Sequence, residues 1–146
     1  KEALKELHIP VGYVDAYYQF VERSKLIDAC DVILVNCYPF WEGCNIEQSS
    51  VYLKQMYAVT QQFAKGKPVI ITETGWPNKG DSLQSAKPTE SNAMKYFIDS
   101  SNWAQKNEIP LFYFSSFDES WKVHHEGDVG ARWGLWDKNE KIKFNQ

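Results

Sequence analysis

Four apolar segments recur along the chain, and each runs into residues typical of turns. They are IPVGYVDAY at residues 9–17, DVILVNCYPF at 31–40, KPVIITETGWP at 67–77 and IPLFYFSSFDES at 109–120. Their apolar character is nearly continuous instead of alternating, which indicates strands that are buried on both faces. The separations between them accommodate βα units of roughly thirty residues. The pattern therefore predicts an α/β fold with a parallel sheet.

Amphipathic stretches between these segments predict helices that cover the sheet. Ser49 or Ser50 can cap a helix that runs to about Ala64, because apolar residues recur there every three or four positions. This apolar stripe consists of Tyr52, Met56, Val59 and Phe63. A second helix is expected over residues 88–107 and a shorter one over residues 22–29.

Composition and charge narrow the class of protein. The 146 residues are 43% hydrophobic and 15% aromatic, which is enough to bury a core, so residues 1–146 are expected to form a single folded unit. The net charge of −3 leaves no broad basic surface, which argues against nucleic acid as a partner. No apolar run reaches the roughly 18 residues of a membrane helix, so no membrane is expected. The first ten residues also lack the features of a secretory signal.

Two groups of potential metal ligands have simpler interpretations. The 3 cysteines, Cys30, Cys37 and Cys44, show no paired spacing for zinc and are expected to be buried thiols with or without one disulfide. The HHEGD run contains His124 and His125, whose side chains point in opposite directions on an extended loop. A solvated loop is the simpler interpretation, and no metal is expected.

A polar residue lies at or just after the end of each predicted strand. These residues are Asp15, Tyr38, Glu73 and Glu119. Both open α/β sheets and β/α barrels assemble their sites at the carboxyl ends of the strands, so the four side chains are expected to converge. Strict alternation along the third strand places Glu73 on the same face as Val69 and Ile71, with Thr72 and Thr74 on the opposite face.

Four motifs, in this order and spacing, resemble glycoside hydrolase family 17. They are LVNCYPFW, ITETGWP, FYFSSFDESWK and RWGLWD, and together they span nearly the whole chain. The family contains β-1,3-glucanases and fungal β-1,3-glucanosyltransferases, and its fold is an eight-stranded, TIM-type β/α barrel. The resemblance assigns the four predicted strands to strands five to eight of that barrel.

The resemblance also implies roles for three residues. Glu73, on the strand that corresponds to the seventh, matches the nucleophile of a retaining mechanism, which forms a covalent glycosyl-enzyme intermediate. Glu119 and Lys122 match an acidic and a basic residue that support the site, and a lysine favours the charged form of a nearby carboxylate. The alternatives are a structural role for Glu73 and a surface ion pair between the other two residues.

Aromatic residues that follow strand ends are candidates for sugar contacts, because a ring can lie against the apolar face of a pyranose. The candidate substrate-binding residues are Tyr38, Phe40, Trp41 and Trp76, with Glu42 and Asp15 as polar contacts. Asp15 could equally cap a turn. The remaining tryptophans considered, Trp103, Trp133 and Trp136, are assigned to packing.

One part of the expected machinery has no match in the chain. Retaining glycosidases need a second carboxyl about 5 to 5.5 Å from the nucleophile. In the resembling family this residue belongs to an Asn-Glu pair after strand four, and neither Asn107-Glu108 nor Asn139-Glu140 lies at a matching position. Barrels of this type need about 250 residues, so the chain is expected to be a carboxyl-terminal half. Its open edges invite a missing amino-terminal half or a second copy of the chain.

These expectations converge on a retaining carbohydrate-active enzyme that cleaves or transfers β-1,3-glucan. Water as acceptor would give hydrolysis and a glucan hydroxyl would give transfer, with Trp41 and Glu42 as the local candidates for controlling the choice. No cofactor is required, and the substrate class implies an extracellular or cell-wall location. The alternatives are a non-catalytic half-barrel that binds glucan without a proton donor, and a glycosidase of a neighbouring barrel family that acts on another β-glucan.

Overall fold

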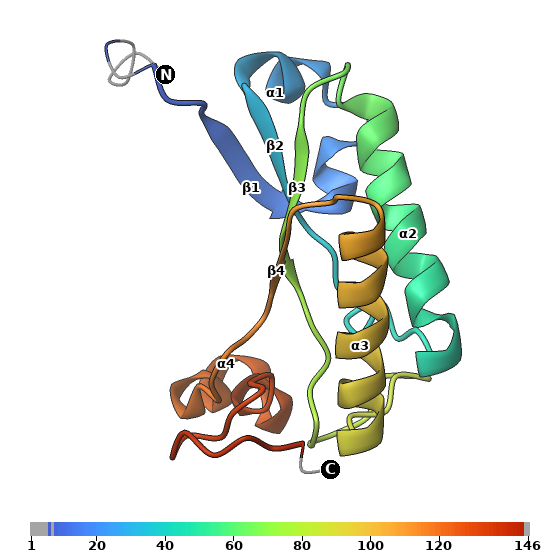
Figure 1. Ribbon diagram of the computed structural model, residues 1–146, viewed down its shortest axis with the longest axis vertical. Coiled ribbons are helices and arrows are strands. Elements are labelled where there is room, and N and C mark those ends of the chain that lie inside the picture. The colour runs from blue at the N-terminus through green and yellow to red at the C-terminus, as the bar shows by residue number, and fades with distance from the viewer. Residues whose placement is uncertain (1–5, 7, 145–146) are drawn as a thin grey trace.

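The computed structural model describes residues 6 and 8–144, in which strands and helices alternate around one parallel sheet (Figure 1). The strands are β1 (Gly12–Ala16), β2 (Val32–Asn36), β3 (Val69–Thr74) and β4 (Leu111–Tyr113), and they pair side by side in chain order. The longer helices are α1 (Ser24–Ala29), α2 (Ile46–Phe63) and α3 (Glu90–Lys106). Short helical turns are η2 (Tyr17–Phe20), η3 (Ser120–Lys122), α4 (Val123–Glu126) and η4 (Asp128–Ala131). The predicted parallel α/β arrangement is therefore present.

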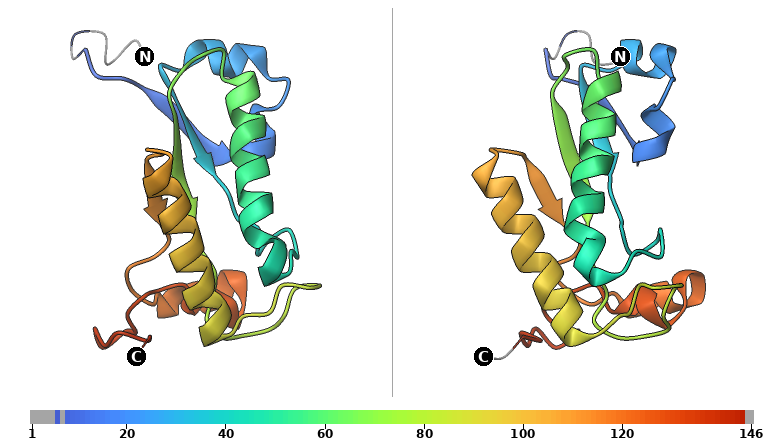
Figure 2. Two further views of the ribbon diagram at one scale, coloured as in Figure 1. Left: turned by 45° about the vertical axis from the view of Figure 1, so that its right-hand side comes forward. Right: turned by 90° about the vertical axis from the view of Figure 1, so that its right-hand side faces the viewer.

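The hydrophobic core lies between the sheet and the helices α2 and α3, which pack on one side of it (Figure 2). Ile33 and Ile71 of the central strands are fully buried there, as are Leu53 and Met56 of α2. Phe112 of the outer strand β4 is by contrast 64% exposed. The sheet is thus covered on one face, and its two outer strands each keep an unpaired edge within the described residues.

The caps of the helices explain where they begin. The helix α2 starts before the predicted serines, because the side chain of Asn45 accepts a hydrogen bond from the backbone N–H of Gln48 at 3.0 Å. Ser49 lies inside the helix instead and donates to the carbonyl of Ile46. The start of α3 was predicted more closely, since Thr89 caps it by accepting from the N–H of Asn92 at 3.2 Å.

A β-bulge in β3 changes the direction of Glu73. The register shifts between Ile71 and Thr74, so Asn36 of β2 pairs with Glu73. Beyond the bulge, Thr74 is buried on the helix side, where its hydroxyl shares a 2.6 Å hydrogen bond with the phenol of Tyr96 from α3. A bulge inserts one extra residue into a strand and redirects the side chains beside it. The expectation that Glu73 shares the face of Ile71 is therefore wrong, and Glu73 lies on the face opposite the helices.

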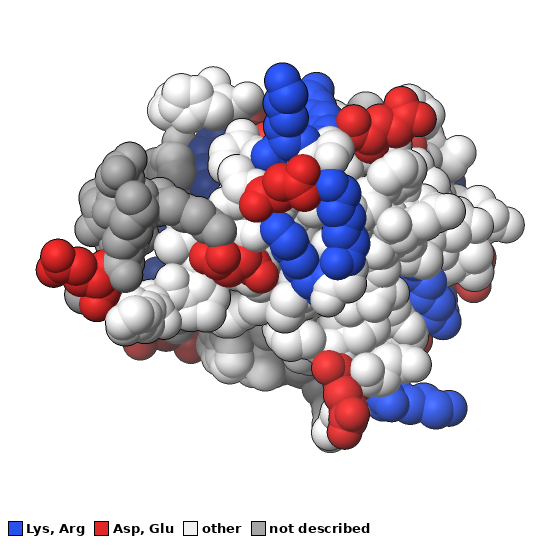
Figure 3. All heavy atoms as spheres, turned by 90° about the horizontal axis from the view of Figure 1, so that it is seen from above, with Lys and Arg blue, Asp and Glu red and all other residues white. Residues whose placement is uncertain are grey.

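The end of the sheet at which the strands begin is a structural region. Lys67 from the loop before β3 donates to the carbonyls of Ile27 and Cys30, both at 2.6 Å, and so satisfies the end of α1. Lys65 pairs with Asp28 at 2.7 Å. Seen from this end, acidic side chains lie among the basic ones instead of forming a patch of one sign (Figure 3).

Within residues 6 and 8–144, no helix has the length and apolar character needed to span a membrane.

Candidate active site

The central feature of the site is a hydrogen bond between two strand ends. The phenol of Tyr38, just after β2, donates to Oε2 of Glu73 in β3 at 2.8 Å. The backbone N–H of Cys37 donates to the carbonyl of Glu73 at 2.9 Å, which aligns the two strands at this point. Burial raises the pKa of Tyr38 far above its ordinary value, and the charge of Glu73 and the hydrogen bond to it act in the same direction. Tyr38 therefore remains a proton donor that orients the carboxylate.

Glu73 opens into a cavity of about 310 Å³ at the carboxyl ends of the strands. The cavity is lined by Tyr38, Trp41, Glu73, Phe114, Lys122, Glu126 and Trp133. Its charged groups are two carboxylates and one ammonium, and four aromatic rings form much of the remaining wall. Such a mixture of aromatic surface and a few polar groups is typical of small-molecule sites, including those for sugars.

Lys122 is held in this cavity by an ion pair and by aromatic rings. Its Nζ lies 2.7 Å from Oε2 of Glu119, which directly precedes η3, whereas Lys122 is the last residue of η3. The same nitrogen lies 4.0 Å from the ring centroid of Phe114, a cation–π contact. The side chain of Lys122 is only 14% exposed, so the pair is more enclosed than a surface i,i+3 ion pair. Glu119 does not line the cavity and acts on it through Lys122.

A second cavity, of about 430 Å³, adjoins the first through shared residues. It is lined by Asp15, Ala16, Tyr17, Tyr18, Asn36, Tyr38, Trp41 and Glu42. Tyr38 and Trp41 line both cavities, and Trp41 is 40% exposed, so its ring has a free surface. Asp15 accepts a 2.8 Å hydrogen bond from the phenol of Tyr13. The structure thus gathers the predicted residues Asp15, Trp41 and Glu42 beside the cavity of Glu73.

Two predicted sugar contacts are instead part of the core. Phe40 is 0% exposed and Trp76 is 1% exposed, and their rings pack edge to face at 5.3 Å. The indole N–H of Trp76 donates to the carbonyl of Lys87 at 3.0 Å, which fixes the long loop after β3. Neither ring lines either cavity, because both side chains turn inward at the strand ends. Phe40 and Trp76 are therefore core residues, and neither ring has a free face for a sugar.

Three residues that line the cavity of Glu73 were not predicted. Trp133, which the sequence pattern assigned to packing, is 3% exposed and packs against Tyr38 at 5.3 Å, yet it also lines the cavity. Phe114 follows β4 directly, and the end of an apolar strand gave no sign of its position. Glu126 lies in α4, where a solvated loop was expected. A helical interpretation of the HHEGD run would have found it, since Glu126 follows Lys122 by four positions.

The histidines and cysteines considered as potential metal ligands do not form a metal site among the described residues. In the part of the chain that the structure describes, no three histidine, cysteine, aspartate or glutamate side chains are grouped to hold a metal ion. His124 and His125 are exposed on α4. All three cysteines are free thiols, and burial raises the pKa of the Cys37 thiol to about 12, which makes it unreactive.

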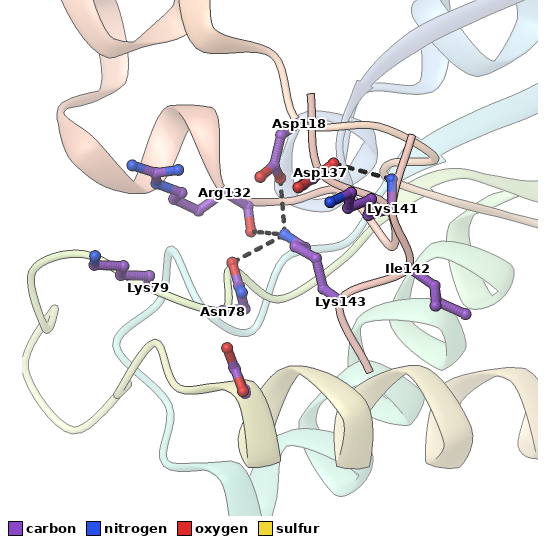
Figure 4. Close-up of a pocket in the computed structure, with 9 residues that line it drawn as sticks. Asn78, Lys79, Asp118, Arg132, Asp137, Lys141, Ile142 and Lys143 are labelled. Atoms are coloured by element: carbon purple, nitrogen blue, oxygen red, sulfur yellow. Dashed lines mark hydrogen bonds and ion pairs between the residues drawn. The ribbon is translucent and has the colours of Figure 1, made fainter. Parts of the chain in front are cut away.

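A larger cavity, of about 650 Å³, lies between the loop after β3 and the end of the described chain (Figure 4). Its lining consists of Asn78, Lys79, Glu90, Asp118, Arg132, Asp137, Lys141, Ile142 and Lys143. Nζ of Lys143 donates to Asp118 at 2.7 Å, to Asn78 at 2.9 Å and to the carbonyl of Arg132 at 3.3 Å. Burial lowers the pKa of Lys143, although its hydrogen bond to Asp118 opposes this shift. Lys143 thus has three acceptors for its three N–H groups, which marks this cavity as a structural junction.

Comparison with known proteins assigns the chain to a family. Residues 1–134 match the model of the BtgE/BtgC glycoside hydrolase domain. The chain belongs to this glycoside hydrolase family. A glucan 1,3-beta-glucosidase of Saccharomyces cerevisiae is 28% identical over 145 residues, which cover 92% of this chain and 46% of that protein. A cell surface mannoprotein of Candida albicans is 30% identical over 129 residues, which cover 87% of this chain and 33% of that protein.

Solved structures confirm the resemblance to family 17. The family 17 β-1,3-glucanosyltransferase from Rhizomucor miehei matches with a TM-score of 0.90 and 33% identity, over 98% of this chain and 52% of that chain. An active-site mutant of that enzyme in complex with laminaritriose matches equally well, with a TM-score of 0.90 and 32% identity. The predicted fold class is confirmed, since the four-stranded parallel sheet with its helices fits half of a TIM-type barrel. The chain spans about half the length of the glucosidase and the glucanosyltransferase that it matches.

Proposed function

We propose that the protein carrying this chain is a retaining enzyme that cleaves or transfers β-1,3-glucan, with Glu73 as its nucleophile. The single observation that supports this most strongly is the position of Glu73, which Tyr38 holds at 2.8 Å in a cavity at the carboxyl ends of the strands. The relatives agree with this proposal, since they include a glucan 1,3-beta-glucosidase and a β-1,3-glucanosyltransferase.

The carboxylate of Glu73 has the freedom that a nucleophile needs. Within the described residues, Tyr38 is its one hydrogen-bond partner and occupies Oε2. In the proposed reaction, Oε1 attacks the anomeric carbon, the bond from this carbon to Oε1 forms, and the glycosidic C–O bond breaks. The leaving oxygen takes a proton from a general acid. Water or a glucan hydroxyl then attacks the same carbon, the general base takes its proton, and Glu73 is released.

The proposed partner of this chain is an amino-terminal half-barrel that supplies the general acid/base. Both outer strands of the sheet, β1 and β4, have an unpaired edge among the described residues, and a closed barrel would pair both edges. The face opposite the helices would then become the barrel interior. The match to about half of the longer relatives supports this partner.

The second cavity is the proposed acceptor side of the site. Trp41 separates it from the cavity of Glu73 and offers an exposed ring, while Asp15 and Glu42 offer carboxylates that can accept hydrogen bonds from hydroxyls. A glucan held there would favour transfer over hydrolysis. Because β-1,3-glucan is a polymer outside the cell, the proposed location is extracellular or in the cell wall, which the cell surface mannoprotein among the relatives supports.

A trapping experiment tests the function directly. The complete protein, or this chain together with its amino-terminal half, is incubated with a 2-deoxy-2-fluoro glucoside that carries a good leaving group, and the labelled peptide is identified by mass spectrometry. The label is expected on Glu73, and a label on another side chain would remove Glu73 from the nucleophile's role. Reducing ends and product lengths from laminari-oligosaccharides separate hydrolysis from transfer. Binding of these oligosaccharides without any turnover would favour the non-catalytic glucan-binding alternative.

A further inference from the structure

Glu126 occupies the cavity of Glu73 without a role in the chemistry described so far. The helix α4 continues directly from η3, so Glu126 lies one helical turn after Lys122, and both side chains line the same cavity. The negative charge of Glu126 also contributes to the raised pKa of Tyr38, which places it near the hydrogen bond that orients the nucleophile.

The backbone around Glu126 forms a tight turn beside the cavity. The helix α4 ends at Gly127 with a φ of +71°, a conformation that favours glycine. Gly130 of η4 packs so closely against α4 that a Cβ there would lie 2.7 Å from Cβ of Glu126 and 2.9 Å from the carbonyl oxygen of Lys122. Two glycines therefore allow a tight turn that holds Glu126 at the cavity.

The hydrogen-bonding capacity of Glu126 is unused within residues 8–144. The neighbouring charged groups are paired, since Lys122 lies 2.7 Å from Glu119 and Arg132 lies 3.6 Å from Asp128. Glu126 has neither a hydrogen bond nor an ion pair in that part of the chain, and its side chain is exposed. An ionised carboxylate can only accept hydrogen bonds, and a pyranose presents several hydroxyl donors. The two are therefore complementary.

We infer that Glu126 is a substrate-binding residue of this site, whose carboxylate accepts hydrogen bonds from hydroxyls of the glucosyl unit next to Glu73. This inference depends on the proposed function, because it concerns the same cavity. It adds a specificity-determining contact from α4, which does not directly follow a strand of the sheet. Gly127 and Gly130 contribute to this contact, because they allow the tight turn that places Glu126 at the cavity.

Variants in the complete protein test the inference. Glu126→Ala is expected to lower kcat/KM on laminari-oligosaccharides roughly 10- to 100-fold, the usual cost of a lost hydrogen bond to a charged group. Glu126→Gln keeps the shape and is expected to lie between the parent and the alanine variant. Glu108→Gln is the matched control, because this exposed glutamate precedes β4 at the other end of the strand and is expected to leave kcat/KM unchanged. Urea unfolding of each variant shows that it is folded.

Deoxy-sugar substrates make the test specific. If Glu126 binds a given hydroxyl, the substrate that lacks this hydroxyl loses activity with the parent, while Glu126→Ala processes the deoxy and complete substrates at similar rates. Equal sensitivity of parent and variant to every deoxy substrate would overturn the inference, as would an unchanged kcat/KM. Rescue of Glu126→Ala by azide would also overturn it, because it would make Glu126 the general acid/base. A parent protein that neither binds nor converts β-1,3-glucan would instead contradict the proposed function.

Discussion

Two of the charged cavities at the carboxyl ends of the strands differ in what they leave free to bind. In the larger one, of about 650 Å³, Lys143 donates to three acceptors and its main partner Asp118 is 7% exposed. In the smaller one, of about 310 Å³, Glu73 has Tyr38 as its one partner and Glu126 has none among the described residues. Charged groups that satisfy one another hold segments together, whereas groups with unused capacity can bind a ligand.

Volume alone would therefore not single out the cavity of Glu73, which we propose as the active site. The larger cavity is twice the size of the smaller one, and it lies on the same end of the sheet. Its charges join the loop after β3 to the last segment of the described chain, as the contacts of Lys143 show (Figure 4). We expect changes in this junction to alter stability, and changes in the smaller cavity to alter turnover.

Glu73→Gln is expected to have the largest effect on turnover. It removes the proposed nucleophile but keeps an oxygen that can accept the hydrogen bond of Tyr38, so kcat should fall by several orders of magnitude. The free energy of unfolding, measured with urea, should stay equal or rise, because the exchange relieves the cost of a partly buried charge. Binding of laminaritriose by calorimetry should persist. Near-normal turnover of the variant would show that Glu73 is not the nucleophile. An unfolded variant would show that the carboxylate of Glu73 is needed for stability.

Lys143→Met should have the complementary effect. It leaves Asp118 buried without its cation, which typically costs about 3 to 5 kcal/mol of the free energy of unfolding. Lys141→Ala removes an exposed lysine from the same cavity and serves as control. Adding Asp118→Asn to Lys143→Met should recover part of the loss, because the unpaired charge is removed. A fall in kcat/KM of the folded Lys143 variant, with unchanged stability in urea, would show that the larger cavity takes part in catalysis.

Tyr38→Phe should lower activity, by less than Glu73→Gln does. It removes the hydrogen bond that orients Glu73, and kcat/KM on laminari-oligosaccharides should decrease roughly 10- to 100-fold. Tyr57→Phe is the matched control, since its phenol bonds to Gln61 on the outer helix α2 at 3.3 Å. Equal activities of the two phenylalanine variants would mean that the phenol of Tyr38 does not assist the carboxylate.

The smallest effect concerns pH and Tyr96, a buried tyrosine of the core. Burial raises the pKa of Tyr96 well above its ordinary value. Its contribution to stability is therefore complete below a pH of about 10, where the unfolded tyrosine ionises, and falls by about 1.4 kcal/mol per pH unit above it. In Tyr96→Phe, the free energy of unfolding should decline less steeply above pH 10, as followed by urea unfolding at several pH values. An unchanged slope would show that Tyr96 ionises as readily in the folded protein as in the unfolded chain.

The strand ends were predictable because one physical rule governs them. Polar residues that follow a continuous apolar strand are carried to the same edge of a parallel sheet. Tyr38 and Glu73 are 35 positions apart and meet at 2.8 Å for this reason. The parallel sheet itself followed from the same apolar runs, and the separations between them left room for the covering helices.

The direction of side chains beyond the strand ends was not predictable from the pattern. Phe40 and Trp41 are neighbours in sequence, yet Phe40 is 0% exposed and Trp41 is 40% exposed. An aromatic ring suits both burial and sugar stacking, so the residue type does not separate the two outcomes and the path of the loop does. Glu126 was missed because four helical residues give too short a period to recognise.

The bulge in β3 also matters for how this site could arise or be lost. A substitution leaves the number of residues in the strand unchanged, whereas a deletion at the bulge changes it. Thr72 and Glu73 both face away from the helices, so removal of Thr72 would restore strict alternation with the acid still on that face and Thr74 still toward the helices. The additional residue thus lets two consecutive side chains, a hydroxyl that bonds to Asn36 and the acid, face away from the helices, where strict alternation would allow only one.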